Sequence, residues 1–307
     1  MNETTTLSGP PIYGHTQVVG VIGWPIEHSV SPPMHNAAFQ ALGLDWCYVP
    51  FAVRPEELKE AIAGITALGL RGINATVPHK QALLPLMDEL TTAARTIGAV
   101  NTVLVQGKRL IGHNTDAQGF LRALRETGFD PEGCKAIVLG AGGAARAIVY
   151  ALASVGSQVT ILNRTPERAK QLAAEFSQVN PKASLQGGPL TPGALAQARG
   201  AQLIVNTTPV GMWPNTQESP WPREVSFPQG VLLFDLIYNP RETRLMRQAR
   251  GAGARAVDGL RMLVHQGAEA FELWTGQSPP VEVMYQACLA VLGGNGKNGK
   301  NGGNGGR

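Results

Sequence analysis

The chain has 307 residues, and 43% of them are hydrophobic, which is enough for two domains that each have a core. The formal net charge is +4, but Lys297, Lys300 and Arg307 contribute three of these charges within the last fifteen residues. The rest of the chain is nearly neutral and has no basic run with interleaved aromatic residues, so we expect no nucleic-acid partner.

The cysteines and the apolar runs indicate the cellular compartment. Cys47, Cys134 and Cys288 are scattered without CxxC spacing, which favours buried thiols over disulfides or metal ligands. No apolar run approaches the ~20 residues of a membrane span, and the N-terminus lacks the charged-then-apolar pattern of a signal peptide. We therefore expect a cytoplasmic protein with no metal site and no membrane partner.

In the first third of the chain, predicted strands alternate with predicted helices. The strands cover residues 18–22, 46–53, 72–77 and 99–105, the last pairing with 109–111 through a turn. The helices cover residues 34–42 with Ser31 as N-cap, 55–68, a segment opened by Pro78-His79-Lys80, and 88–97. This alternation predicts an open α/β domain with a mostly parallel sheet over residues 15–115.

A predicted helix at residues 115–127 leads into the second half of the chain. Further helices are expected at 166–176, 242–250, 260–274 and 281–292, and strands at 203–205 and 231–236, while 177–200 has only a weak pattern. Residues 116–258 therefore form a second open α/β domain. Residues 293–307 are Gly/Asn/Lys low complexity with nothing to bury, and we expect this tail to be disordered.

The second domain opens on a glycine pattern between two apolar runs. Lys135–Leu139 reads as a strand, Gly140 to Ala145 as a turn entering a helix, and Val159–Leu162 as the next strand. Gly140 permits the tight turn, and Gly142 lets a pyrophosphate approach the backbone at the helix N-terminus. Glycines also mark ordinary turns, but the position between two strands favours a Rossmann-like dinucleotide site.

The residues after the second strand distinguish the two nicotinamide cofactors. An NAD site usually has an acidic residue there for the ribose 2′-hydroxyl, whereas this chain has Asn163 and Arg164, with Arg168 one turn further on. Two guanidinium groups can bind a 2′-phosphate by charge-assisted hydrogen bonds. The alternative is a pair of solvated arginines, but cations in the first turn of a helix oppose its dipole unless an anion is bound. We therefore predict NADP.

Polar residues gather at the predicted strand ends of the first domain, where ligands of α/β sheets collect. They are Ser29, Ser31, Asn74, Thr76, Lys80, Asn101, Asn114 and Asp116. Taken singly, each could only cap a helix or satisfy a strand end. Together they predict a site for a small polyhydroxylated molecule, whose carboxylate the serines could hold.

Lys80 is the candidate for proton transfer. Oxidation of an alcohol by hydride transfer releases a hydroxyl proton, which a lysine can accept, and a nearby Asp116 would orient it. His79 and His28 are alternative bases, ranked behind Lys80. The plainer alternative is that Lys80 is a solvated lysine at a helix start.

Several motifs in order resemble those of the shikimate dehydrogenase family. They are His28-Ser29-Val30-Ser31-Pro32, Asn74 to Lys80, Gly98 to Thr102, Gly112 to Asp116, Gly140 to Ala145, Asn163-Arg164-Thr165 and Asp258 to Gln266. The resemblance spans residues 18 to 292. It implies two α/β domains with an active-site cleft between them, and residues 259–292 folding back to complete the first domain.

The resemblance also implies roles for particular residues. It implies that Lys80 and Asp116 are the catalytic pair, and that a second set binds shikimate: Ser29, Ser31, Thr76, Asn101, Asp116, Tyr238 and Gln266. It implies that NADP is bound by Gly140, Ala141, Gly142, Gly143, Ala144, Asn163, Arg164, Thr165, Arg168, Leu236 and Gly259. Some members have methionine where this chain has Leu236; both are apolar.

The expected activity is the NADPH-dependent, reversible reduction of 3-dehydroshikimate to shikimate in aromatic amino-acid biosynthesis. A quinate or dual quinate/shikimate dehydrogenase is the nearest alternative, since quinate differs by one extra hydroxyl. A non-catalytic NADP-binding sensor is an alternative of another class, disfavoured by the presence of both Lys80 and Asp116. The sequence does not fix the oligomeric state, and a homodimer is retained as one option.

Overall fold

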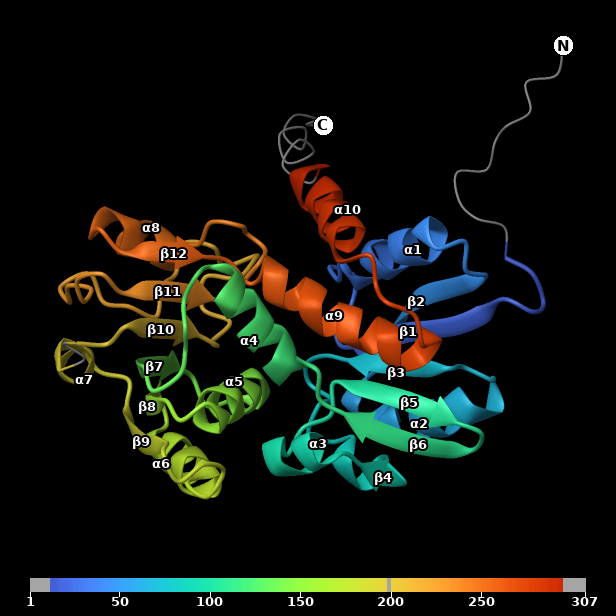
Figure 1. Ribbon diagram of the computed structural model, residues 1–307, viewed down its shortest axis with the longest axis horizontal. Helices are drawn as coiled ribbons and strands as arrows, with labels where there is room; N and C mark the ends of the chain where they lie inside the picture. The colour runs from blue at the N-terminus through green and yellow to red at the C-terminus, as the bar shows by residue number, and fades with distance from the viewer. Residues whose placement is uncertain (1–11, 198–199, 295–307) are drawn as a thin grey trace, which may run out of the picture.

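The computed structural model describes residues 12–197 and 200–294, and over these residues the strands form two six-stranded sheets flanked by helices (Figure 1). The first sheet takes its strands from residues 17–113 and the second from residues 135–257. Helices α4 (Asp116–Glu126) and α9 (Leu260–Thr275) run between the two units. The predicted fold class, two α/β domains, is confirmed.

The first sheet has the strand order β2-β1-β3-β5-β6-β4. Its strands are β1 (Gln17–Gly23), β2 (Trp46–Ala52), β3 (Gly72–Ala75), β4 (Glu89–Leu90), β5 (Thr102–Gln106) and β6 (Arg109–His113). The pairings of β1 with β2, β1 with β3 and β4 with β6 are parallel, as expected for a mostly parallel sheet. Strand β5 is antiparallel to β3 and β6. Its pairing with β6 is a hairpin, because the Gly107 turn reverses the chain within a few residues.

The second sheet has the order β12-β11-β10-β7-β8-β9, and all of its pairings are parallel. Its strands are β7 (Lys135–Leu139), β8 (Gln158–Asn163), β9 (Ser184–Pro189), β10 (Leu203–Asn206), β11 (Leu232–Asp235) and β12 (Arg255–Val257). The strand order reverses between β7 and β10, which is the doubly wound dinucleotide-binding topology. Ligands of such sheets bind beyond the carboxyl ends of the strands at this reversal.

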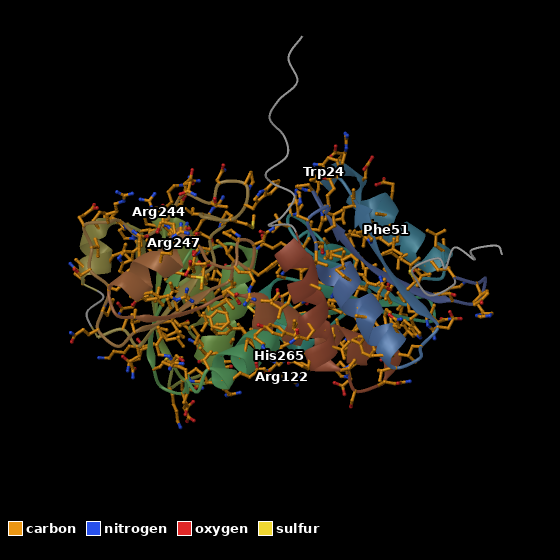
Figure 2. All side chains as sticks on the ribbon, turned by 90° about the horizontal axis from the view of Figure 1, so that it is seen from above. Trp24, Phe51, Arg122, Arg244, Arg247 and His265 are labelled. Carbon is orange, nitrogen blue, oxygen red and sulfur yellow. The ribbon has the colours of Figure 1, made fainter. Side chains whose placement is uncertain are left out.

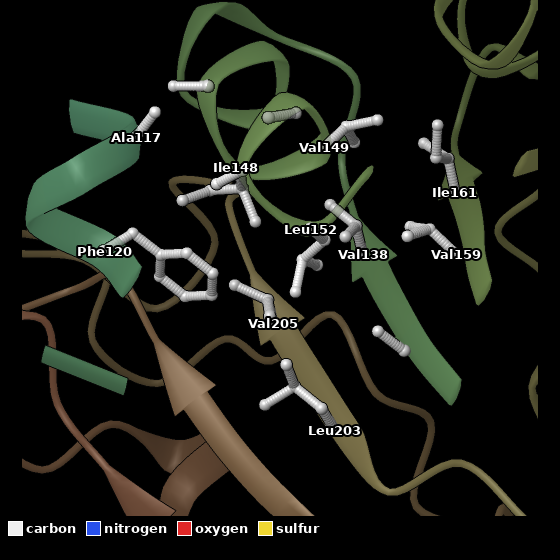
Figure 3. Packing of buried hydrophobic residues seen from close by; sticks show 14 of the residues in the cluster. Ala117, Phe120, Val138, Ile148, Val149, Leu152, Val159, Ile161, Leu203 and Val205 are labelled. Carbon is white, nitrogen blue, oxygen red and sulfur yellow. The ribbon is translucent and has the colours of Figure 1, made fainter. Parts of the chain in front are cut away.

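Helices cover both faces of the second sheet. They are α5 (Gly143–Ser154), α6 (Pro166–Phe176), α7 (Pro192–Ala196) and α8 (Arg244–Gly251). On one face, Phe120 of α4 and Ile148 of α5 are fully buried against Val138 and Val205 of the sheet (Figure 3). On the other face, Leu195 and Leu245 join a separate buried cluster. Burial of apolar surface on both faces stabilises a sheet of continuous apolar strands.

The C-terminal helices α9 and α10 (Val281–Gly294) pack on the first domain together with α1 (Ser31–Ala41). Trp274 of α9 donates a hydrogen bond from Nε1 to the carbonyl of Val103 at 3.1 Å. Helix α9 also crosses α4 closely, because a Cβ on Gly119 would lie 2.7 Å from the backbone nitrogen of Gln266. The remaining helices of the first domain are α2 (Leu58–Ala67) and α3 (Thr92–Ile97).

Three local predictions in the first domain are wrong. Ser31 is the first residue of α1 and not its cap; Val30 occupies that position without a side-chain hydrogen bond. Pro78-His79-Lys80 forms a turn, followed only by a 3₁₀ helix at Leu84–Leu86, and β4 shortens the helix expected at 88–97 to α3. The Lys80 carbonyl accepts from the backbone nitrogen of Val100 and the nitrogen of Leu84 donates to Gln81, so a helical hydrogen bond between Lys80 and Leu84 is not formed.

Strand β9, helix α7 and strand β12 lie where the sequence predicted no regular structure. Gly187 explains the weak strand pattern of β9, since a Cβ there would lie 2.3 Å from the backbone of Ala169 in α6. Close approach of a helix therefore requires glycine inside this strand. Helix α10 extends to Gly294, and the rest of the predicted tail lies outside the described residues. Within the described part of the chain, no helix has the length and apolarity to cross a bilayer.

Candidate active site

The structure brings Lys80 and Asp116 into direct contact. Lys80 lies in the turn after β3, and its carbonyl accepts a hydrogen bond from the backbone nitrogen of Val100 at 2.8 Å. Its Nζ donates to Oδ2 of Asp116 at 2.6 Å, and the two side chains are 18% and 7% exposed. Thr115, not Asp116, is the N-cap of α4, so the Asp116 carboxylate does not cap its helix.

Asn101 joins this pair to helix α9. Its Nδ2 donates to Oδ1 of Asp116 at 2.9 Å and lies 3.2 Å from Oε1 of Gln266. Its Oδ1 accepts from the backbone nitrogen of Thr115 at 2.8 Å. The amide therefore fixes the start of α4, and with it Asp116, while the carboxylate keeps one oxygen for Lys80.

A second polar chain connects Asn101 to the serine segment. Asn74 donates from Nδ2 to the Asn101 carbonyl at 3.2 Å and accepts on Oδ1 from the hydroxyl of Tyr48 at 2.8 Å. Burial raises the pKa of Tyr48 well above its ordinary value, and a hydrogen bond with Ser31 opposes that rise. Ser29 Oγ accepts from the backbone nitrogen of Ser31 at 3.3 Å. Hydrogen bonds thus run from Tyr48 through Asn74 and Asn101 to Asp116 and Lys80.

The two histidines considered as alternative bases lie elsewhere. His79 is 1% exposed, and its Nε2 lies 2.8 Å from the carbonyl of Val53. That bond commits the ring to the interior and contradicts its candidacy as a base. His28 is exposed, and its ring lies against Trp213.

Thr76 and Tyr238 are not bonded to this network within the described part of the chain. Thr76 is half-buried beside Gly23, where a Cβ would lie 2.5 Å from its Cγ2. Burial raises the pKa of Tyr238 to about 12, with a smaller contribution from Cys288 of α10. Over the described residues, neither side chain makes a hydrogen bond to the Lys80–Asn101 group.

The glycine turn fits a bound pyrophosphate. Gly140 has φ +107°, and a Cβ there would lie 2.6 Å from Oγ1 of Thr207, so only glycine suits the turn. A Cβ on Gly142 or Gly143 would meet nothing within 4 Å. Gly142 is the N-cap of α5 and provides no side-chain cap. The backbone N–H groups at the start of α5 are therefore open to an anion.

The end of β8 fits a 2′-phosphate. Asn163 ends the strand and donates from Nδ2 to the carbonyl of Thr165 at 2.9 Å, which shapes the entry into α6. Arg164, Thr165 and Arg168 are exposed, and no salt bridge found among the described residues includes either arginine. Both guanidinium groups are thus available to a phosphate at the strand end. The position at which an NAD site usually has an acidic residue is occupied by Asn163.

Leu236 and Gly259 are in contact where β11 and β12 end. A Cβ on Gly259 would lie 2.0 Å from the Leu236 carbonyl oxygen, which excludes any side chain there. Both residues lie at the carboxyl ends of strands of the second sheet. This is the edge at which a doubly wound sheet receives a cofactor.

Three residues of the network were missed by the sequence analysis. Tyr48 reads as an ordinary strand aromatic, and nothing local marks its hydroxyl as part of a site. Thr102 and Thr115 bond to Asn74 and Asn101. The sequence does mark these two threonines, because the dipeptide Asn-Thr occurs at both 101–102 and 114–115.

One cavity of the described residues lies away from this site. It measures about 630 Å³ and is lined mainly by the ends of α4 and α8 and the start of α9, including Arg241, Arg250 and Arg261. It shares no residue with the predicted substrate or cofactor sets. In the part of the chain that the structure describes, no group of three or more His, Cys, Asp or Glu side chains could hold a metal ion.

A lysine of the first α/β domain pairs with the aspartate that begins α4, and the second domain has a doubly wound, arginine-marked dinucleotide fold. Together they define a two-domain nicotinamide-dependent dehydrogenase. Three family models match the chain. They are the shikimate dehydrogenase substrate binding domain at residues 21–103, shikimate / quinate 5-dehydrogenase at 123–186, and the shikimate 5′-dehydrogenase C-terminal domain at 259–289. The chain belongs to the shikimate dehydrogenase family.

Full-length relatives agree. The chain is 48% identical over 283 residues to the shikimate dehydrogenase (NADP(+)) of Methanothermobacter thermautotrophicus, covering 92% of this chain and 99% of the relative. It is 50% identical over 280 residues to that of Methanopyrus kandleri, covering 89% and 95%.

Solved structures share the fold over nearly the whole length. A crystal structure of a shikimate dehydrogenase in complex with NADP+ is 40% identical, with a TM-score of 0.87 over 93% of this chain and 99% of that one. The Thermus thermophilus enzyme in complex with NADP(H) and shikimate is 42% identical, with a TM-score of 0.82 over 90% and 100%. The quinate dehydrogenase of Corynebacterium glutamicum in complex with NAD is less similar, at 32% identity and a TM-score of 0.81 over 90% and 99%.

Proposed function

We propose that this chain catalyses the reversible, NADPH-dependent reduction of 3-dehydroshikimate to shikimate, a step of aromatic amino-acid biosynthesis. The observation that carries the proposal is the 2.6 Å contact between Lys80 and Asp116, linked through Asn101 to the polar residues of the first domain. The names of the relatives support it, as does the Thermus thermophilus structure, which is a complex with both NADP(H) and shikimate.

Lys80 is proposed to move the proton. NADPH, when bound, supplies the hydride to the carbonyl carbon. The ammonium of Lys80 then donates a proton to the oxygen of that carbonyl, and in the reverse direction it takes the proton from the hydroxyl. Asp116 holds Nζ by the short hydrogen bond, and Asn101 holds Asp116.

The substrate residues divide by chemistry. Ser29, Ser31 and Tyr238 are hydroxyl donors, which suits them to the carboxylate. Thr76, Asn101, Asp116 and Gln266 are proposed to bind the ring hydroxyls, since together they offer donors and acceptors. The Gln266 amide is held in place by donating to the Leu263 carbonyl at 2.8 Å, which leaves its oxygen toward Asn101.

The cofactor residues also divide into groups. Gly140 to Ala144 are proposed to bind the pyrophosphate through backbone N–H groups at the start of α5. Asn163, Arg164, Thr165 and Arg168 are proposed to bind the adenosine phosphate, with the arginines as the charged donors. Leu236 and Gly259 are proposed to lie beside the nicotinamide, where an apolar side chain and a bare backbone leave room for a flat ring.

Domain limits, assembly and compartment complete the proposal. The substrate domain is residues 15–115 with 259–292, and the NADP domain is 116–258; the strand ranges of the two sheets and the packing of α9 and α10 support this division. The active site is proposed to be a cleft between them.

A cytoplasmic location is supported by three free cysteines. A homodimer is proposed for solution and is tested by light scattering.

Steady-state kinetics with four substrate–cofactor pairs test the function. Shikimate and quinate are each assayed with NADP and with NAD. The proposal expects the highest kcat/KM for shikimate with NADP. A higher value for quinate would support the runner-up, a quinate or dual quinate/shikimate dehydrogenase, which the quinate dehydrogenase among the structural neighbours makes the natural comparison. NADPH binding without turnover of any of these substrates would instead support a sensor.

A further inference from the structure

The rings of His28 and Trp213 are both exposed, and they form a contact between the two domains. His28 follows β1 in the first domain, and Trp213 lies in the loop after β10 in the second. Their ring centroids are 4.5 Å apart with an interplanar angle of 62°, which is an edge-to-face contact. Figure 2 shows Trp24, four residues before His28, on the opposite edge of the molecule from Arg122 of α4 and His265 of α9. The segment from Trp24 to His28 thus begins at the edge away from those two helices.

Trp213 is fixed by its backbone while its side chain stays half-exposed. Its backbone nitrogen donates to the carbonyl of Asn239 at 3.1 Å, and Gly211 turns the chain before it at φ +95°. The residue is 48% exposed. An indole held outside the core of its own domain is available for a partner on the other domain.

Each ring is linked to a proposed substrate contact, His28 through the chain and Trp213 through its hydrogen bond to Asn239. His28 precedes Ser29, and the Asn239 that holds Trp213 follows Tyr238. The serines and Tyr238 are the residues proposed for the substrate carboxylate, one set from each domain. A ligand bound there acts on the same two segments that carry the rings.

We propose that His28 and Trp213 form a latch between the substrate and cofactor domains, with both acting as positioning residues for the hydride-transfer geometry. The inference rests on the proposed function, because it assigns the latch to the complex that holds both ligands. A contact that forms only when the domains are together favours that arrangement, and each ligand that also favours it strengthens binding of the other.

Loss of the latch has a defined kinetic signature. NADPH on its own loses no more affinity than the free energy of the aromatic contact allows, since neither ring touches the proposed cofactor residues. The enhancement of NADPH affinity by shikimate falls, and kcat/KM for shikimate falls about twofold to tenfold, the range expected for one aromatic pair. The pair shikimate with NADPH is suitable for binding because both molecules are reduced and cannot react.

A double-mutant cycle tests the latch with His28→Ala, Trp213→Ala and the double variant. The dissociation constant of NADPH is measured with and without shikimate, and kcat and KM are measured separately. We expect the double variant to be no worse than the poorer single variant, and Trp213→Phe to restore most of the loss. Trp24→Ala is the matched control, since Trp24 is another exposed tryptophan and its ring lies under the guanidinium of Arg54. It should leave the ligand enhancement unchanged.

Strictly additive effects of the two substitutions would overturn the latch, as would a Trp24→Ala effect equal to that of Trp213→Ala. Thermal unfolding midpoints of the same proteins without ligand give a cycle that needs no turnover, and the contact predicts a non-additive pair there as well. Failure of the wild-type chain to oxidise shikimate would contradict the proposed function alone and leave this second cycle standing as the test of the latch.

Discussion

Lys80 and Asp116 are 36 positions apart in sequence, yet Nζ of the lysine donates to Oδ2 of the aspartate at 2.6 Å. Lys80 belongs to a turn of the first domain, whereas Asp116 is the first residue of α4, the helix that leads to the second domain. The position of Asp116 therefore depends on how α4 packs. Packing at the crossing of α4 with α9 can therefore alter the geometry of the site.

Gly119→Ala tests that crossing. A Cβ at Gly119 would lie 2.7 Å from the backbone nitrogen of Gln266, so α9 must move away from α4. We expect overpacking to lower the free energy of unfolding by about 1–3 kcal/mol and to raise KM for shikimate, because Gln266 is displaced from Asn101. Chemical denaturation and steady-state kinetics measure the two effects.

Gly64→Ala is the matched control for this change. Gly64 also lies inside a helix, α2, but a Cβ there would meet nothing within 4 Å. This variant should keep its KM and gain up to about 1 kcal/mol of stability from helix propensity. Equal behaviour of the two variants would contradict the role assigned to the α4–α9 crossing.

Arg164→Ala tests cofactor selection. Loss of one hydrogen bond to a charged group costs about 1.5–3 kcal/mol, so KM for NADP should rise about tenfold to a hundredfold. KM for NAD should change little, since NAD lacks the 2′-phosphate. Arg247→Ala on α8, an exposed arginine of the same domain (Figure 2), is the control and should alter neither constant. Similar increases for both cofactors in Arg164→Ala would refute phosphate recognition by this residue.

Glu269 on α9 makes stability depend on pH. Burial raises the pKa of its carboxyl from 4.5 to about 7, Glu272 and Asp116 add to the rise, and Arg122 of α4 opposes it. Its Oε2 is buried and has no hydrogen-bond partner among the described residues. Between about pH 4.5 and pH 7 the folded chain holds a proton that the unfolded chain releases, so the free energy of unfolding falls as pH rises.

Glu269→Gln should remove that dependence, because the amide resembles the protonated carboxyl and does not titrate. We expect the variant and the wild type to be similar near pH 4.5 and the variant to be the more stable above pH 7. Denaturant unfolding across this range provides the measurement, with Glu60→Gln, an exposed glutamate of α2, as control. Parallel stability profiles for Glu269→Gln and the wild type would contradict the raised pKa.

Sequence patterns were sufficient where one local rule determined the structure. Gly140 and Gly142 between two apolar strands predicted the doubly wound domain, and Asn163 with Arg164 predicted the phosphorylated cofactor. Ser31 was misread because a serine before two prolines is a good cap, whereas here it starts the helix. Its tertiary neighbours, Tyr48 above all, determine its place, and no local pattern reveals them.

The unpredicted elements have tertiary causes as well. Gly187 lies in β9 because α6 is too close for a side chain there. The segment therefore lacks the apolar pattern from which a strand is predicted. The turn at Pro78 replaced the expected helix and placed Lys80 beside α4. Contacts between residues far apart in sequence, such as His28 with Trp213, depend on how the domains are arranged.

Lys80→Ala is the most direct test of the central claim, that the Lys80–Asp116 pair performs the proton transfer of shikimate oxidation. The decisive quantity is kcat with NADP, measured beside the dissociation constant of shikimate and with Lys59→Ala, an exposed lysine of α2, as control. We predict that kcat falls about a hundredfold or more while shikimate affinity changes little, since general acid–base catalysis contributes about 10²–10⁴-fold. Turnover close to that of the wild type would contradict the claim and remove Lys80 from the mechanism.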